Sequence, residues 1–208
     1  MFSVGIIGCG SIGNKRAKAL GARGKLVACA DTDFKKADTL AKTHNATPFD
    51  NWADLLKIDE IDIVIISTLH DSLAEITLAA VRSNKHVLVE KPAARSASEL
   101  EQIISPIEST SFKVRVGFNH RYHRSLLKAK EIVVSGVLGE IMFLRGRYGH
   151  GARVGYDREW RANPILSGGG ELIDQGPHLI DLSRWFIGDF IDVVSLLFHY
   201  CLSSCNFS

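Results

Sequence analysis

The sequence predicts an α/β fold with a doubly wound parallel sheet, followed by an incomplete second domain of the α+β type. Short apolar runs alternate with helical patterns over residues 1–118. Strands separated by helices pair in parallel through right-handed crossovers, so this alternation predicts one continuous sheet. After residue 118 the pattern becomes less regular, and we place a second domain at residues 119–208.

We expect six strands in the first domain, ending near residue 118. The predicted strands are 3–7, 25–30, 48–49, 61–67, 86–90 and 113–118, and the predicted helices are 11–23, 34–44, 51–57, 73–83 and 96–108. The run at 63–66 is apolar on both faces, which is typical of the centre of a parallel sheet. In the second domain we expect a helix at 125–135, a strand at 140–148, a long amphipathic helix after residue 170 and a strand-like run at 191–198.

Composition excludes several classes of protein. Apolar residues make up 46% of the 208 residues and charged residues 23%, which is average for a soluble domain. The net charge is +2 without a basic block, so we expect neither nucleic acid nor an anionic membrane as partner. The chain has no run of transmembrane length and no secretion signal, and the four cysteines form no disulfide framework or metal site, which predicts a cytoplasmic protein.

The segment from Gly8 to Gly13 reads GCGSIG and lies between the first strand and the first helix. In a dinucleotide-binding turn, Gly8 permits the tight turn, Gly10 lets the backbone approach the pyrophosphate, and Gly13 lets the helix pack closely. The pyrophosphate then lies at the helix N-terminus, beside Ser11 and Ile12, where unpaired N–H groups favour an anion. The first domain is therefore predicted to be a Rossmann-type domain that binds a dinucleotide.

Asp31 follows the second strand, eighteen residues after Gly13. A carboxylate at this position can accept hydrogen bonds from both ribose hydroxyls and would repel a 2′-phosphate, so NAD is favoured over NADP. Lys35 and Lys36 could neutralise a phosphate, so NADP is possible. The alternative is that Asp31 only caps the next helix.

Two further segments follow strands and should face the cofactor crevice, because ligands bind beyond the carboxyl ends of parallel strands. Ser67 and Thr68 follow the fourth strand, and Glu90 and Lys91 follow the fifth. Lys91 could donate a hydrogen bond to a substrate hydroxyl and stabilise an alkoxide that forms as hydride leaves. The alternative is a surface salt bridge between Glu90 and Lys91.

Asp174 and His178 are four residues apart in a predicted helix and should be neighbours on its surface. A carboxylate beside an imidazole raises its basicity and orients it, which suits removal of a proton from an alcohol. The alternative is an ordinary surface pair. Pro177 should kink the helix unless it lies in the first turn.

The junction between the domains carries further polar residues. Asn119 and Arg121 could reach the crevice and bind substrate hydroxyls. We expect His120 and His123 to be ordinary polar loop residues.

The motifs GCGSIG, EKP and GGGELIDQGPHLIDLSRWFIGD together resemble the Gfo/Idh/MocA oxidoreductases, and GFNHRYHRSLLKAKEIVVSGVLGEI is similar to that family's domain junction. The resemblance covers residues 1–192. It implies an NAD(P)-dependent enzyme that acts on a hydroxyl of a sugar, inositol or nucleotide-sugar and, at full length, forms a homo-oligomer. It also implies that His178 is the general acid/base, that Lys91 and Asp174 position and polarise the hydroxyl, and that the loop from Tyr148 to Trp160 adds carbohydrate contacts.

Two features depart from the family pattern. Residues 67–71 read STLHD where the family often has Thr-Pro. The family's second domain is longer than the remaining residues, and the tail 193–208 has no Asp, Glu, Lys or Arg, as a frameshift, an alternative exon or a truncated reading frame would produce. The missing strands leave open an NAD-binding protein with little or no catalysis that associates through an incomplete sheet. The resemblance leaves open a third interpretation, NAD-dependent glycoside cleavage that begins with transient oxidation.

Overall fold

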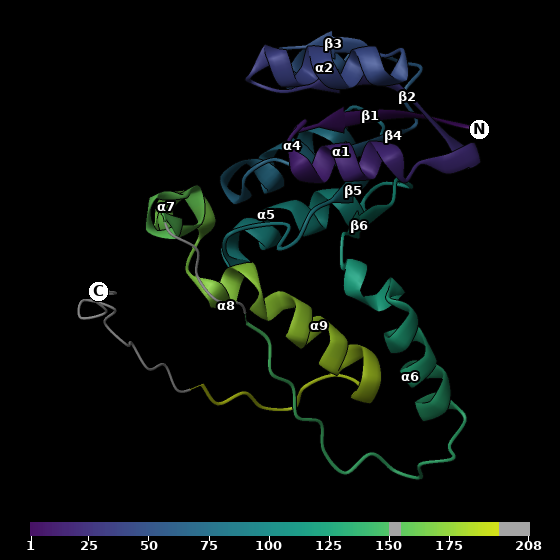
Figure 1. The fold of residues 1–208 in the computed structure, drawn as a ribbon, viewed down its shortest axis with the longest axis vertical. Helices are drawn as coiled ribbons and strands as arrows, with labels where there is room; N and C mark the ends of the chain where they lie inside the picture. Colours follow the sequence, from purple (N-terminus) through teal and green to yellow (C-terminus); the bar gives the residue numbers. More distant parts are fainter. Residues whose placement is uncertain (150–154, 196–208) are drawn as a thin grey trace.

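The computed structural model describes residues 1–149 and 155–195. Its first part is a six-stranded sheet in the order β3-β2-β1-β4-β5-β6, and all neighbouring strands are parallel (Figure 1). The strands are β1 (Phe2–Ile7), β2 (Gly24–Ala30), β3 (Thr47–Phe49), β4 (Ile63–Ile66), β5 (His86–Val89) and β6 (Val114–Val116). The order reverses direction at β1, and the predicted doubly wound α/β fold is confirmed.

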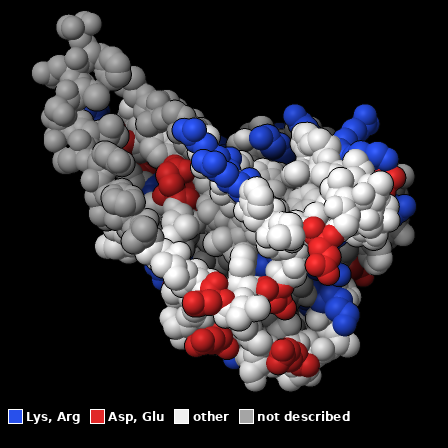
Figure 2. Space-filling model, turned by 90° about the horizontal axis from the view of Figure 1, so that it is seen from below, with Lys and Arg blue, Asp and Glu red and all other residues white. Residues whose placement is uncertain are grey.

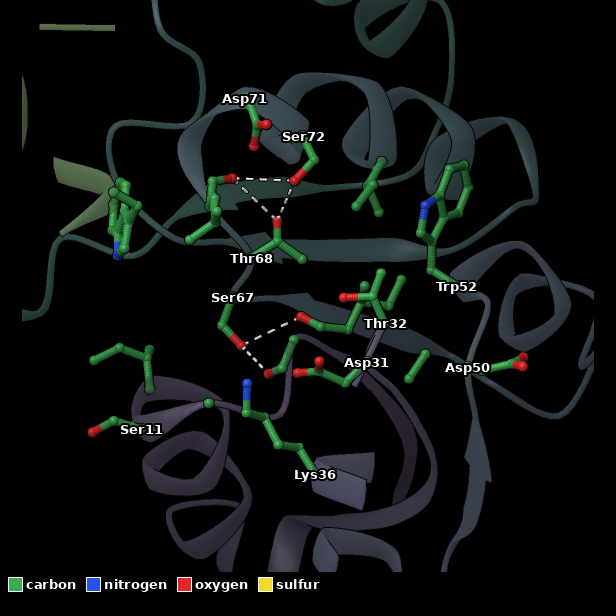
Figure 3. Close-up of a pocket in the computed structure, with 18 of the residues that line it drawn as sticks. Ser11, Asp31, Thr32, Lys36, Asp50, Trp52, Ser67, Thr68, Asp71 and Ser72 are labelled. Atoms are coloured by element: carbon green, nitrogen blue, oxygen red, sulfur yellow. Dashed lines mark hydrogen bonds between the residues drawn. The ribbon is translucent and has the colours of Figure 1, made fainter. Parts of the chain in front are cut away.

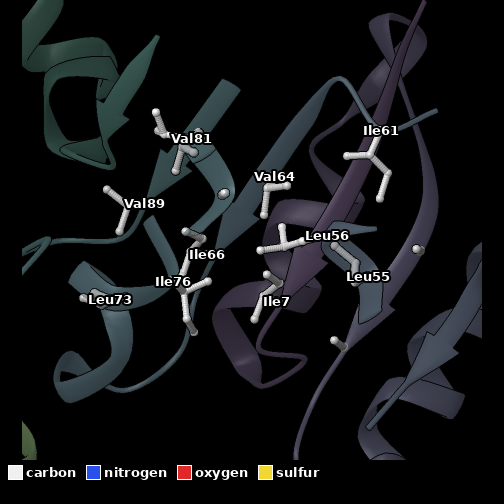
Figure 4. Close-up of a cluster of buried hydrophobic side chains, with 14 of the residues drawn as sticks. Ile7, Leu55, Leu56, Ile61, Val64, Ile66, Leu73, Ile76, Val81 and Val89 are labelled. Carbon is white, nitrogen blue, oxygen red and sulfur yellow. The ribbon is translucent and has the colours of Figure 1, made fainter. Parts of the chain in front are cut away.

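Helices cover both faces of this sheet. The helices of the first part are α1 (Ser11–Lys18), α2 (Phe34–His44), α3 (Trp52–Leu56), α4 (His70–Arg82) and α5 (Ala97–Glu108). On one face α1 and α2 pack against Ile6 and Cys29, whereas α3 and α4 pack on the other face against Ile7, Val64 and Ile66 (Figure 4). Because β1 and β4 are buried on both faces, their sequences are almost continuously apolar.

The first helix is shorter than predicted. It ends at Lys18 rather than Arg23, and Gly21–Arg23 forms a separate 3₁₀ turn. Gly21 has a φ of +58°, which interrupts right-handed helix and turns the chain into β2.

The second part consists of short helices around one longer pair. They are η2 (Asn119–Tyr122), α6 (Arg124–Val134), η3 (Tyr156–Arg158), η4 (Trp160–Ala162), α7 (Pro164–Ser167), α8 (Glu171–Asp174) and α9 (Gly176–Ile187). In Figure 1, α6 and α9 lie beyond the β6 edge of the sheet, at the opposite end from β3. The face in Figure 2 carries both basic and acidic side chains with uncharged surface between them, and no helix of the described ranges is long and apolar enough to cross a bilayer.

Two strand predictions for the second part are wrong where the structure describes them. Residues 141–149 run back alongside α9 without regular secondary structure, and residues 192–195 are also irregular. A strand needs a hydrogen-bonded neighbour, and the described residues of this part provide none. Residues 196–198 of the second predicted strand lie outside the described residues.

The long helix predicted after residue 170 is divided. It consists of α8 and α9, separated by Gln175. Pro177 lies in the first turn of α9, where its missing N–H leaves no intrahelical hydrogen bond unmade and no kink results. The division places Asp174 and His178 on two different helices.

Candidate functional site

The space around each glycine of the turn explains why glycine stands there. Gly8 has a φ of +90°, and a Cβ there would lie 2.5 Å from the carbonyl oxygen of Ser67. A Cβ on Gly13 would lie 2.0 Å from the carbonyl oxygen of Gly8. A Cβ on Gly10, in contrast, would meet no atom within 4 Å. Gly8 and Gly13 are therefore required by packing, whereas the bare backbone at Gly10 leaves open space that a ligand can approach.

This open space is part of a cavity of about 590 Å³ at the carboxyl ends of β1, β2 and β4 (Figure 3). Its volume is within the range of small-molecule sites. Seven of the predicted cofactor residues line it, namely Gly8, Gly10, Ser11, Ile12, Asp31, Ser67 and Thr68. Gly13 lies behind the turn, and Glu90 and Lys91 are not among the lining residues. The volume, the glycine turn and the carboxylate fit a dinucleotide.

Asp31 holds the turn and is not a helix cap. Its Oδ2 accepts a hydrogen bond from the backbone N–H of Cys9 at 2.8 Å, and its Oδ1 accepts one from Asp33 at 2.9 Å. Helix α2 is capped by Asp33, whose side chain accepts from the N–H of Lys35, so the capping alternative for Asp31 is wrong. Each carboxylate oxygen retains a second acceptor site for a ribose hydroxyl. Lys36 also lines the cavity (Figure 3), whereas Lys35 does not.

The loop after β4 connects the cavity to the second part. The Ser67 hydroxyl donates to the carbonyl oxygen of Gly8 at 2.8 Å, which joins this loop to the glycine turn. His70 is buried at the start of α4, and its Nδ1 lies 2.9 Å from the carbonyl oxygen of Ser167. Its ring also meets that of Trp160 edge-on, with centroids 4.7 Å apart. No sequence pattern predicts these contacts of His70 with Ser167 and Trp160.

Glu90 and Lys91 point to different partners. Arg16 Nε donates to Glu90 Oε1 at 2.6 Å, whereas Lys91 Nζ donates to the Asp174 carboxylate at 2.5 Å and to its backbone carbonyl at 2.6 Å. The alternative of a Glu90–Lys91 surface salt bridge is therefore wrong. The end of β5 delivers its lysine to α8, 83 positions further along the chain.

Asp174 is the charge centre of this cluster. It is 3% exposed and also accepts from Arg161 Nε at 3.0 Å and from Gln175 Nε2 at 3.1 Å. Burial raises the pKa of the Asp174 carboxyl, but the hydrogen bonds and charges of Lys91 and Arg161 outweigh it, so the pKa lies below its usual value. Asp174 therefore stays ionised and holds two cations in place.

His178 differs from the expectation. It is 6% exposed, and its Nδ1 has no hydrogen-bond partner among the described residues. Burial lowers its pKa to about 4, with further lowering from the charges of His120 and Lys91, while Asp174 acts in the opposite direction and is outweighed. Asp174 thus raises the basicity of His178 as expected, but burial is the largest influence and the net shift of the pKa is downward. His178 is neutral at neutral pH.

The junction residues take different positions. The His120 ring lies against that of His178, with centroids 3.9 Å apart and planes 31° apart. His120 is therefore not the ordinary loop residue we expected, and no local sequence pattern signals the contact. Arg121 forms a two-pronged ion pair with buried Asp181 and lies over the Trp185 ring, while Asn119 is exposed. Substrate binding by Asn119 and Arg121 stays a prediction.

The remaining candidates are only partly described. In the loop from Tyr148 to Trp160, Tyr148 lies 6.1 Å from the His178 ring and Trp160 lines the cavity, whereas 150–154 lie outside the described residues. Cys201 and Cys205 also lie outside them. Within the described ranges, no group of three or more His, Cys, Asp or Glu side chains is arranged to hold a metal ion.

Comparison with known families gives two matches. The model described as "Oxidoreductase family, NAD-binding Rossmann fold" (GFO_IDH_MocA) matches residues 2–118. The model described as "GFO/IDH/MocA C-terminal domain" matches residues 126–202, so it extends into the uncharged tail.

Individual relatives agree with these matches. The chain is 31% identical to inositol 2-dehydrogenase of Rubrobacter xylanophilus over 93% of this chain and 54% of the relative. It is 30% identical to levoglucosan dehydrogenase of Pseudarthrobacter phenanthrenivorans over 71% of this chain and 38% of the relative.

Solved structures of similar fold also match most of this chain and about half of their own length. A levoglucosan dehydrogenase in complex with NADH and levoglucosan has a TM-score of 0.83 at 25% identity, over 91% of this chain and 54% of that one. A myo-inositol 2-dehydrogenase from Lactobacillus plantarum has a TM-score of 0.81 at 29% identity, over 90% and 56%. The chain spans about half the length of these relatives. It belongs to the Gfo/Idh/MocA oxidoreductase family, whose NAD-binding Rossmann fold forms its first part.

Proposed function

We propose that the chain binds NAD in the 590 Å³ cavity and carries the proton-transfer residues of a dehydrogenase that oxidises a hydroxyl of a sugar or polyol. The observation that carries this proposal is the hydrogen-bonded pair of Lys91 and Asp174, which joins the carboxyl end of β5 to α8. It brings a cation, a carboxylate and the neutral imidazole of His178 into one cluster near the cofactor cavity. Arg161 belongs to both, because it lines the cavity and donates to Asp174.

NAD is favoured over NADP by Asp31. Its carboxylate lies in the cavity with acceptor sites for the ribose hydroxyls, and its charge opposes a 2′-phosphate. Lys36 lines the same region and reduces this preference. The NADH complexes of the similar levoglucosan dehydrogenase support the proposal.

Bound NAD would supply the hydride acceptor. Lys91 would donate a hydrogen bond to the reacting hydroxyl and stabilise the negative charge that develops on its oxygen. His178 would accept the hydroxyl proton, for which it must be unprotonated, as its lowered pKa ensures at pH 7. Because an imidazole of such low pKa is a weak base, the stabilisation by Lys91 is essential to the step.

The substrate class we propose is that of sugars and polyols. The names of similar dehydrogenases contain inositol, levoglucosan and glucose 6-phosphate. A cytoplasmic location is also part of the proposal, supported by the free buried thiols of Cys9 and Cys29. A homo-oligomer is supported by exposed apolar side chains on α8 and α9, among them Leu172 and Ile180.

Cofactor binding can be tested by calorimetry with NAD. In Gly10→Ala the added methyl group would occupy only open space, so we expect the melting temperature to stay and NAD affinity to fall at least about tenfold. Gly170→Ala, also in open space but outside the cavity, should leave both unchanged. Equal NAD affinity in Gly10→Ala and the parent chain would contradict the proposed site.

Catalysis can be tested by NADH formation with myo-inositol, levoglucosan and glucose 6-phosphate. We expect Lys91→Ala to lower turnover about a hundredfold or more, because its ammonium would stabilise the charge on the reacting oxygen. NAD affinity should stay, because Lys91 does not line the cofactor cavity. NAD binding with no turnover on any of the three would favour the alternative of an NAD-binding protein without catalysis.

A further inference from the structure

A cluster of aromatic rings surrounds His178. The imidazole of His120, from η2, lies against one side of the His178 ring at 3.9 Å between centroids. Tyr148 lies 5.4 Å from His120 and 6.1 Å from His178, and Phe118 meets His178 edge-on at 6.4 Å. Two separate segments, the junction at Phe118–His120 and the stretch before residue 150 at Tyr148, therefore contribute rings to the surroundings of one imidazole.

These rings surround His178 where a proton-transferring imidazole commonly has a hydrogen-bond acceptor that orients its ring. An imidazole that transfers protons commonly has its second nitrogen fixed by a carboxylate or carbonyl. His178 Nδ1 has no such partner among the described residues, and the Asp174 carboxylate is directed to Lys91. Among the described residues, the neighbouring rings are the contacts that can restrict the plane of the His178 ring.

The same contact couples the charges of the two histidines. Two imidazolium rings about 4 Å apart repel each other strongly in a partly buried site. The other charged groups that act on His178 are Lys91, Asp174 and Asp181. Burial, followed by the charges of His123 and Lys91, also lowers the pKa of His120. The pair thus resists taking up two protons, and the charge on His120 opposes protonation of His178.

We propose that His120 is a positioning residue of this site, which restricts the plane of the His178 ring and extends toward acid the pH range in which His178 can accept a proton. The inference rests on the proposed function of His178 as the base. According to this inference, His120 acts on the reaction only through His178 and does not contact the reacting atoms.

The test is an NMR titration of the His178 imidazole in the full chain, with His120→Phe, His120→Gln and the control His123→Ala. Phe keeps a ring against His178 and removes the charge, and Gln removes both the ring and the charge. We expect the His178 midpoint to rise by about one pH unit in both His120 variants and to stay in His123→Ala. With substrate, the acid limb of the pH profile of kcat/KM should move to higher pH by the same amount in His120→Phe. The value of kcat should be lower in His120→Gln than in His120→Phe, because Gln lacks the ring.

The two proposals can fail separately. If the chain turns over no substrate but the His178 midpoint rises in the His120 variants, the coupling stands and only the function of the site is contradicted. A His178 midpoint within about 0.2 pH units of the parent chain in a folded His120→Phe or His120→Gln variant would overturn the inference. Equal kcat in the Phe and Gln variants would overturn its positioning part.

Discussion

Mild acid should destabilise the folded chain through a single proton on His178. The pKa of this imidazole is lowered from 6.5 to about 4 in the folded state. Between these two values the unfolded chain binds a proton at this position and the folded chain does not. Stability therefore falls as the pH drops from about 6.5 toward 4, and the contribution is fully present above 6.5.

The magnitude follows from the two pKa values. One pKa unit corresponds to about 1.4 kcal/mol. With a folded pKa of about 4 and an unfolded pKa of 6.5, linkage gives a loss of about 2 kcal/mol between pH 7 and pH 5 from this residue alone. Because His178 is only 6% exposed, solvent screening reduces this value little.

Urea unfolding followed by tryptophan fluorescence at pH 7 and pH 5 measures the effect. The comparison is between the parent chain and His178→Gln, since both carry every other histidine and the difference between them reports His178 together with its coupling to His120. We expect the parent chain to lose about 2 kcal/mol more than the variant over this interval. An equal loss in the two proteins would refute the lowered pKa of His178 and, with it, the argument that this residue is buried in the neutral form.

Two further predictions concern the carboxylates of the site. Asp31→Asn removes the charge that opposes a 2′-phosphate while Lys36 remains in the cavity, so the NADP to NAD affinity ratio should rise about tenfold; an unchanged ratio in calorimetry would contradict the assignment. Asp174→Asn leaves Lys91 and Arg161 beside a neutral amide, so the free energy of unfolding should fall by about 2 kcal/mol or more. The measurement is urea unfolding at pH 7, and a fall below about 0.5 kcal/mol would show that the ion pairs contribute little.

The first part of the fold could be predicted because its signals are local. The apolar run at Ile63–Ile66 reports burial on both faces of a central strand, and this is where the structure places it. The glycine turn reports steric requirements that any side chain at Gly8 or Gly13 would violate. Such constraints act within a few residues or between adjacent strands, so the sequence pattern contains them directly.

The chemistry of the site depends on contacts between distant residues, and the sequence could not supply it. Helical spacing predicted that Asp174 lies beside His178. In the structure the helix is broken at Gln175, and the Asp174 carboxylate binds Lys91, which lies 83 positions earlier in the chain. The partner of His178 is instead His120, whose loop sequence looks unremarkable for a junction. The strand expected at residues 140–148 failed for a related reason, since strand structure requires a neighbour that local sequence does not show.

Helix α9 shows how the site is held together. Its polar residues face inward: His178 and Asp181 are buried because His120 and Arg121 of the junction provide partners. Its apolar residues include Ile180 and Ile187, which are 47% and 48% exposed. Within the described ranges, the junction thus supplies contacts to the buried side of the helix, while His178 Nδ1 is left without a hydrogen-bond partner. It follows that cofactor affinity and the titration of His178 can be measured on this chain, whereas substrate turnover also depends on what covers the apolar half.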